Sequence, residues 1–311
     1  MPKPTLAAPT AKQRLLKYLF TRYFQPRLEE LTGKRVLQLD YPAGGAPQYT
    51  PESGADPQLL PWFEAQRPMC QATTRLIHAY RGDLERIPVA SADPLSPTWK
   101  NKWFSGLDAM ALYAIVASRH PRRIIEVGSG HSTKFAARAI RDHRLETELV
   151  SLDPKPRAVI DQLCDRIVRS RVEKADLALF DELVAGDILF IDGSHRVYTS
   201  SDVTILFLRV VPRLRPGVIL HVHDILLPWD YPAEWTSRYY SEQYLLASWL
   251  LAQPARFRLL MSNAFVSFDP ELRREARELF AGSPLAYMLA EQYRTGDVRG
   301  LSGGSLWLEM M

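Results

Sequence analysis

The chain has 311 residues, a formal net charge of +4 at pH 7 and a hydrophobic fraction of 46%. This length and composition allow a full buried core of about two domains. The basic residues are spread without a dense run, which argues against nucleic acid as a partner. Cys70 and Cys164 have no C-x-x-C spacing, so neither a disulfide framework nor a zinc cluster is predicted, and a reducing cytoplasm is the expected location.

The first 105 residues are expected to form an N-terminal, mainly helical cap or lid region. They contain many prolines, a turn-rich patch over residues 41–57, and apolar residues at helical spacing over residues 15–30 and 63–84. Lysines and arginines interrupt the first apolar run, which is also too short to span a membrane. We therefore expect an amphipathic helix that packs on the body, with membrane-surface contact as the alternative and no stable membrane insertion.

From residue 106 onward, strand and helix signals alternate along the chain. The predicted strands cover residues 123–127, 148–153, 169–174, 187–192, 218–224, 257–265 and 305–310, and helices are expected over residues 158–163 and 177–183. Such an alternation predicts an α/β fold in which a parallel sheet carries helices on both faces.

The most informative segment is IIEVGSGHST, residues 124–133, in which a buried strand and a glycine turn precede a helix. Gly128 and Gly130 allow the backbone to turn sharply against a ligand. A dinucleotide site favours G-x-G-x-x-G, but the third glycine is missing here and Glu126 stands before the turn. A carboxylate at this position repels a pyrophosphate and suits a cation. A tight turn without a ligand is the alternative interpretation.

The E-x-G-x-G pattern resembles the first motif of the class I S-adenosylmethionine (SAM)-dependent methyltransferases, whose cofactor carries a sulfonium and an amino group. The resemblance covers roughly residues 105–311. It implies a Rossmann-like, seven-stranded, mostly parallel sheet with an antiparallel last strand, in a domain over residues 106–311. The cofactor-binding residues that it implies are Glu126, Gly128, Ser129, Gly130, Ser132, Asp153, Asp176 and Asp192.

Two of these acidic residues have separate expected contacts. Asp153 ends the second predicted strand, where the family places an acidic residue whose two oxygens accept the ribose hydroxyls of SAM. Asp176 lies where family members often touch the adenine. Its alternative role is an N-cap of the helix predicted over residues 177–183.

Polar side chains also follow the fourth and fifth strands, at the edge of the sheet where ligands bind. Asp192 ends the fourth strand, and His223 and Asp224 end the fifth. These three residues are a candidate site for Mg²⁺, Mn²⁺ or Fe²⁺, and their placement resembles catechol-type and macrolide-sugar O-methyltransferases. His223 departs from the acidic or amide residue of those families. Without a metal, Asp192 would shape the substrate pocket or cap a turn, and His221 is interpreted as a core histidine.

His195 follows Gly193-Ser194 in a loop just beyond the fourth strand. Because its ordinary pKa lies near neutrality, it is the candidate general base that takes a proton from the methyl acceptor, with Asp192 as the second catalytic residue. A fourth metal ligand and a simple turn residue are the alternative roles for this histidine.

The expected function is therefore SAM-dependent methylation of a small-molecule acceptor, at oxygen. A nicotinamide-dependent oxidoreductase, a metal-dependent hydroxylase of the cephalosporin-hydroxylase kind and a binding protein without turnover are the alternatives. Residues 99–106 are expected to help form a lid over the cofactor, and the aromatic residues over 229–244 to form a substrate wall or a packing surface. A homodimer stays open as the assembly.

Overall fold

The computed structural model describes residues 10–33, 36, 45–295 and 297–311. The chain divides into two compact units, residues 1–46 and residues 47–311. In the described part of the chain, no helix combines the length and the apolar character needed to cross a membrane.

The first unit contains one helical stretch, made of α1 (Ala11–Leu19), a π-helical segment η1 (Phe20–Phe24) and α2 (Gln25–Thr32). Thr10 begins it with a capping box, because its side chain accepts from Gln13 N and the Gln13 side chain accepts from Thr10 N. Gly33 ends it with a φ of +64°. The helix predicted over residues 15–30 is confirmed, whereas residues 41–44 of the turn-rich patch lie outside the described residues.

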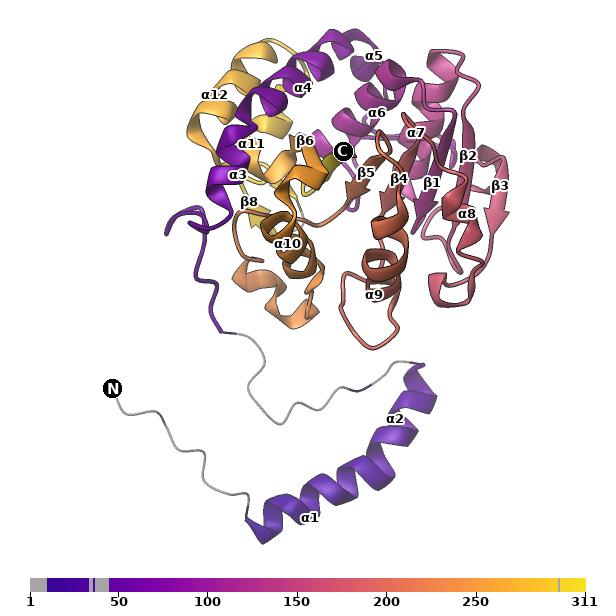
Figure 1. Cartoon of the computed structure of the whole chain (residues 1–311), viewed down its shortest axis with the longest axis vertical. Coiled ribbons are helices and arrows are strands. Elements are labelled where there is room, and N and C mark those ends of the chain that lie inside the picture. The colour runs from indigo at the N-terminus through magenta and orange to yellow at the C-terminus, as the bar shows by residue number, and fades with distance from the viewer. Residues whose placement is uncertain (1–9, 34–35, 37–44, 296) are drawn as a thin grey trace. The chain divides into compact units, whose positions relative to one another are not determined.

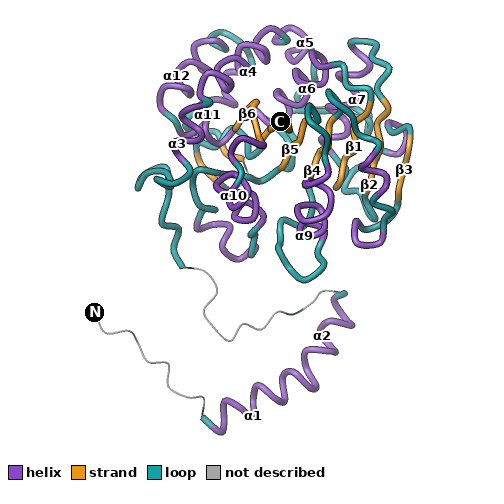
Figure 2. Tube along the Cα trace, viewed as in Figure 1, coloured by secondary structure: helices purple, strands orange, loops and turns teal. Residues whose placement is uncertain are grey.

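The second unit is built around a seven-stranded sheet (Figures 1 and 2). Its strands are β1 (Arg123–Val127), β2 (Glu148–Leu152), β3 (Arg166–Val168), β4 (Ile188–Ile191), β5 (Ile219–Val222), β6 (Phe257–Ser262) and β9 (Leu306–Met310). They lie in the order β3-β2-β1-β4-β5-β9-β6, and β9 runs antiparallel to both of its neighbours while the other pairs are parallel. The predicted Rossmann-like sheet with an antiparallel last strand is confirmed.

Helices surround this sheet (Figure 2). They are α3 (Leu60–Ala65), α4 (Arg67–Ala79), α5 (Arg81–Glu85), α6 (Leu107–Arg119), α7 (His131–Asp142), α8 (Ala178–Asp181), α9 (Asp202–Ile205), α10 (Glu242–Ala252), α11 (Asn263–Phe268) and α12 (Pro270–Leu279). α6 packs against both α4 and α7, and α4 also packs against β6. Since α6 is apolar around most of its circumference, it is buried on almost every side.

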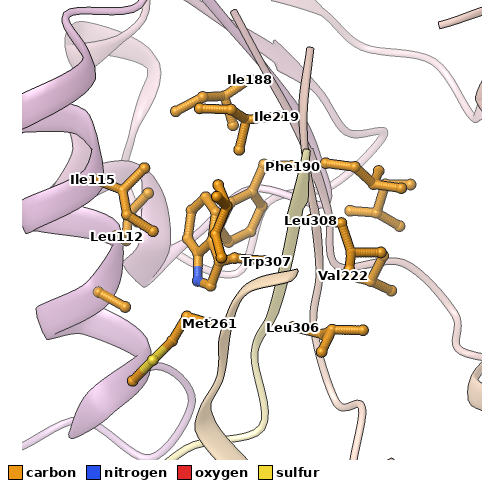
Figure 3. Close-up of a cluster of buried hydrophobic side chains, with 14 of the residues drawn as sticks. Leu112, Ile115, Ile188, Phe190, Ile219, Val222, Met261, Leu306, Trp307 and Leu308 are labelled. Carbon is orange, nitrogen blue, oxygen red and sulfur yellow. The ribbon is translucent and has the colours of Figure 1, made fainter. Parts of the chain in front are cut away.

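The core forms where β9 inserts between β5 and β6 (Figure 3). Trp307 of β9 lies 6.2 Å from Phe190 of β4, measured between ring centroids. Leu112 of α6 and Met261 of β6 are fully buried in the same cluster. Burying such large apolar side chains stabilises each by about 1.5–3 kcal/mol, so the last strand of the chain is tied firmly to the centre of the fold.

Two local predictions between β2 and β4 are wrong. The third strand lies at Arg166–Val168, before the predicted residues 169–174, and Val172–Lys174 form a 3-10 turn. The helix predicted over residues 158–163 is reduced to one 3-10 turn, Asp161–Leu163. Residues 158–174 contain only short apolar runs, which favour neither helix nor strand. Pairing with β2 in the folded protein therefore decides which of these residues form a strand.

The end of the sixth strand and the path to the last one also differ from the prediction. β6 stops at Ser262, because the Ser262 side chain accepts from Phe265 N and caps α11. Residues 263–265, predicted as strand, are therefore helical. The chain then passes through α12 and a short hairpin of β7 (Arg294–Thr295) and β8 (Val298–Arg299) before β9.

The helices of residues 60–85 belong to the same compact unit as the sheet. Phe63, Ile77 and Leu84 are fully buried. The boundary between the two units lies between residues 46 and 47, whereas the sequence placed the end of the cap near residue 105.

Candidate functional site

The glycine turn after β1 is built against the end of β4. Gly128 has a φ of +81°, and a Cβ atom placed on it would lie 1.8 Å from the carbonyl oxygen of Asp192. The backbone N–H of Asp192 donates to the carbonyl of Val127 over 2.8 Å. Only glycine combines this conformation with this close approach, so the turn requires glycine at position 128. A Cβ on Gly130 would meet no atom within 4 Å.

Glu126 lies beneath this turn and is 2% exposed. The Thr133 hydroxyl donates to its carboxylate, while the Ser129 hydroxyl pairs with that of Ser151 over 2.8 Å. Burial raises the pKa of Glu126 to about 7, although the neighbouring hydroxyl groups favour the ionised form and so lower the pKa in part. The Glu126 carboxylate thus ties the turn to the start of α7. The Glu126 side chain does not line the cavity that lies next to this turn.

A cavity of about 420 Å³ opens at the carboxyl ends of the first parallel strands. Of the predicted cofactor residues, its lining includes Gly128, Ser129, Gly130, Ser132, Asp153 and Asp192. Two further cavities lie elsewhere, one along α7 and one along α12. The cavity at the strand ends is the one at the edge where open α/β sheets bind ligands.

Asp153 lies half-buried in the wall of this cavity. One carboxylate oxygen accepts from Ser129 N over 2.8 Å, and the other accepts from Lys155 N over 2.7 Å. Each oxygen can accept a further hydrogen bond. The residue therefore fits its predicted role of holding vicinal hydroxyl groups.

Aromatic residues before α6 form another part of the cavity wall. Trp103 and Phe104 line it, and the guanidinium of Arg157 lies over the Trp103 ring at 4.7 Å from the ring centroid. Two residues of the segment 99–106 therefore line the cavity, and its expected role as a lid over the cofactor stays a prediction.

The structure does not bring Asp176 to the cavity. Its side chain is exposed and accepts from Ala178 N over 2.9 Å beside the start of α8, although the N-cap residue of that helix is Leu177. Val172 and Glu173 line the cavity at this point. The sequence missed them because a strand was predicted over residues 169–174.

Four polar side chains meet beyond the ends of β4 and β5. His195 Nε2 lies 3.2 Å from Asp192 Oδ1 and 3.6 Å from Asp224 Oδ2. On the other side of the ring, Nδ1 lies 2.9 Å from Glu242 Oε2 at the start of α10. His195 and Asp224 both adopt a left-handed backbone, with φ of +59° and +54°. Such conformations are uncommon for residues other than glycine and concentrate at functional sites.

The carboxylates around His195 set its charge. Burial alone would lower its pKa, but hydrogen bonds to Asp192 and Glu242, with the charge of Asp224, raise the pKa well above the ordinary histidine value. Burial opposes the ionisation of Asp192, yet the charge of His223 and the His195 hydrogen bond lower the pKa of Asp192 to about 2. The ring is therefore a cation held among carboxylates. A general base must be able to accept a proton, so the His195 cation would first have to release one to its neighbours. The general-base role of His195 stays a prediction.

The two histidines of β5 and its end differ in their surroundings. His221 is fully buried, stacks on Phe190 with ring centroids 3.7 Å apart, and shares Ser305 Oγ as a partner at 2.8 Å. Burial lowers its pKa well below the ordinary value, and the core interpretation of this residue is confirmed. His223 Nδ1 lies 3.3 Å from the same hydroxyl, while its Nε2 lies 3.7 Å from Asp224 Oδ1.

This geometry does not fit the divalent cation that the sequence suggested. In the described residues, no three His, Cys, Asp or Glu side chains are arranged to hold a metal ion. The His195 ring approaches both Asp192 and Asp224, so an N–H donor stands where the cation would have to bind. The metal set of Asp192, His223 and Asp224 stays a prediction without support from the arrangement.

The aromatic residues after β5 divide between packing and the site. Trp229 packs against Phe265 and Phe268 and is buried in the core. Tyr240 lies 4.6 Å from the His195 ring, measured between centroids, and is partly exposed. The Tyr240 ring also packs against Tyr231 and Trp235, so it joins the His195 loop to this aromatic cluster.

The strand order, with β9 antiparallel between β5 and β6, is a Rossmann-like arrangement consistent with the methyltransferase fold. Residues 125–225 match a family model described as "Methyltransferase domain". This match supports a class I SAM-dependent methyltransferase, and it covers β1 through the residues that follow β5.

A search of solved structures returned, among others, an SAH-bound methyltransferase from Podospora anserina, PaMTH1, with 18% sequence identity and a TM-score of 0.36. The alignment covers 59% of this chain and 82% of that chain. A search of curated proteins found no match.

Proposed function

We propose that the protein transfers a methyl group from SAM to an oxygen atom of a small-molecule acceptor. The observation that carries the proposal is the cavity at the strand ends, which joins the glycine turn and Asp153 to Asp192. Asp192 in turn contacts His195. A place for the cofactor and a group able to handle a proton therefore adjoin one another.

The residues of the cavity fit SAM. The glycine turn brings backbone close to the ligand, and Asp153 presents two acceptor oxygens to the ribose hydroxyls. When bound, SAM supplies a methyl carbon that is already electrophilic. Trp103 and Phe104 help to keep water from that carbon.

The acceptor is proposed to bind beside Asp192, His195 and Asp224. As the acceptor oxygen bonds to the methyl carbon, its O–H bond breaks and the proton passes to this coupled group. The cofactor leaves as a neutral thioether, so charge and protons balance. The proposal contains no metal step, because the His195 ring stands between the two carboxylates.

Binding tests the cofactor half of the proposal. Calorimetry is carried out with SAM, with its demethylated product and with NAD. We expect saturable binding of the first two and none of NAD, since the third glycine of the dinucleotide motif is absent. Binding of NAD without any response to SAM would overturn the proposal in favour of an oxidoreductase.

The target atom needs a transfer assay. The protein is incubated with SAM labelled with ¹³C in its methyl group and with panels of small hydroxyl, amine and thiol compounds, and the products are followed by NMR. An O-methyl signal supports the proposal, whereas products methylated only on nitrogen or sulfur contradict it.

The remaining expectations concern the setting of the reaction. We propose a cytoplasmic protein without a nucleic-acid partner, on the basis of its dispersed charge and its lack of cysteine pairs. A homodimer stays open, and sedimentation velocity decides it.

A further inference from the structure

Glu242 at the start of α10 contacts the histidine of the site from the side opposite Asp192. It lies 47 residues after His195 and is fully buried, and its Oε2 lies 2.9 Å from His195 Nδ1. Its second oxygen, Oε1, has no hydrogen-bond partner among the described residues. Burying a carboxylate with one oxygen unsatisfied is costly, so a structural reason alone does not explain this residue.

Backbone contacts join the same two segments. The N–H groups of Ser241 and Glu242 both donate to the carbonyl of His195, over 2.8 and 3.2 Å. The Ser241 hydroxyl accepts from Val197 N over 2.8 Å. These bonds hold the left-handed backbone of His195, and with it the point from which the ring projects.

The histidine loop is also fixed from its other side. Asp202 accepts from Ser194 N over 2.7 Å and from the Ser194 hydroxyl. The backbone on either side of His195 is therefore anchored, and the ring is left with its side-chain torsions as the main freedom. The hydrogen bond between Nδ1 and Glu242 restricts rotation of the ring about these torsions. It thereby leaves Nε2 as the nitrogen that faces Asp192 and Asp224.

We propose that Glu242 is a positioning residue, which holds the His195 ring so that Nε2 faces the acceptor side of the site between Asp192 and Asp224. This inference rests on the proposed function for the identity of the acceptor side. Glu242 touches neither the cavity nor the reacting atoms, and it acts through the orientation of the His195 ring.

The direct test is NMR of the His195 ring in protein labelled with ¹⁵N-histidine, with the signals assigned by their loss in His195→Gln. In the unmodified protein we expect a single ring state with a downfield Nδ1 proton. In Glu242→Leu that proton signal should vanish. In Glu242→Gln, which keeps the side-chain volume and an acceptor oxygen but no charge, it should move upfield.

The control is Glu271→Gln, since Glu271 also lies in the first turn of a helix but is largely exposed on α12. It should leave the His195 signals unchanged. An Nδ1 proton at its original position in Glu242→Leu would overturn the inference. If the leucine variant does not fold, an unshifted signal in Glu242→Gln overturns it equally.

A kinetic readout separates positioning from cofactor binding. Glu242→Gln should lower kcat for methyl transfer by about 10- to 100-fold, because general acid–base catalysis contributes about 10²- to 10⁴-fold and a misoriented ring loses part of it. KM for SAM should stay within about twofold. Equal kcat in the variant and the parent would contradict the inference. The NMR measurement needs neither SAM nor acceptor, so failure of the parent protein to bind SAM would overturn the proposed function alone.

Discussion

Gly128 and Asp192 approach each other so closely that a methyl group on the glycine would lie 1.8 Å from the aspartate carbonyl oxygen. The two residues directly follow the neighbouring parallel strands β1 and β4 and belong to the same cavity wall. The shape of the strand-end cavity therefore depends on a backbone contact, and this contact yields the first prediction.

Gly128→Ala should unfold the protein at a markedly lower temperature, because the added methyl both clashes and forces a left-handed alanine. We expect a loss of more than about 2 kcal/mol. Gly130→Ala is the matched control: an added Cβ meets no atom within 4 Å and the φ of 177° is not left-handed, so its cost should be clearly smaller than that of Gly128→Ala. Denaturant unfolding measures both, and equal losses would contradict the argument.

Asp153→Asn should weaken SAM binding by about tenfold or more, because a charge-assisted hydrogen bond contributes about 1.5–3 kcal/mol. The substitution keeps the size of the side chain and one acceptor oxygen, so folding should be retained. Calorimetry measures the affinity. Asp181→Asn, at an exposed ion pair with Arg213, is the control and should bind SAM normally. Unchanged affinity in Asp153→Asn would remove this residue from the cofactor site.

Glu126 makes the stability depend on pH. Its pKa in the folded protein is raised to about 7 from 4.5, so the folded state holds a proton that the unfolded state releases. This stabilisation is complete below pH 4.5 and is lost as the pH rises toward 7, by about 3 kcal/mol at most. Glu126→Gln should lack this dependence.

Unfolding free energies of the parent and Glu126→Gln are compared from pH 5 to pH 8. The unfolding free energy of Glu126→Gln relative to that of the parent should increase steadily with pH, and then level off above pH 7. A difference that is constant over this range would show that Glu126 is ionised in the folded protein throughout.

Metal removal addresses the sequence prediction at Asp192, His223 and Asp224. After treatment with a chelator, titration with Mg²⁺ or Mn²⁺ should give no saturable binding at micromolar concentration, because the His195 ring lies against Asp192 and Asp224. SAM affinity should also be unchanged. One bound equivalent that disappears in Asp192→Asn would reverse this conclusion.

Much of the sheet follows from short-range patterns. β1 lies at the predicted residues, and β2, β4, β5 and β9 lie within their predicted ranges, because each is a continuous apolar run next to turn residues. The prediction failed at residues 169–174, where the apolar pattern was weak. It also failed after Ser262, where the apolar run continues although Ser262 caps a helix. The glycine turn and Asp153 were also readable, since strand, carboxylate and glycines lie within one short segment.

The surroundings of His195 required the folded chain. Its partner Glu242 comes from a helix 47 residues away and belongs to no motif, and the aromatic residues between them gave no sign of which would pack and which would face the site. The sequence alone determined the class of fold and the position of the glycine turn that lines the strand-end cavity, because strand periodicity and turn chemistry are local. The charge, orientation and partners of the histidine were decided only by tertiary structure, because they depend on burial and on carboxylates brought together from distant segments.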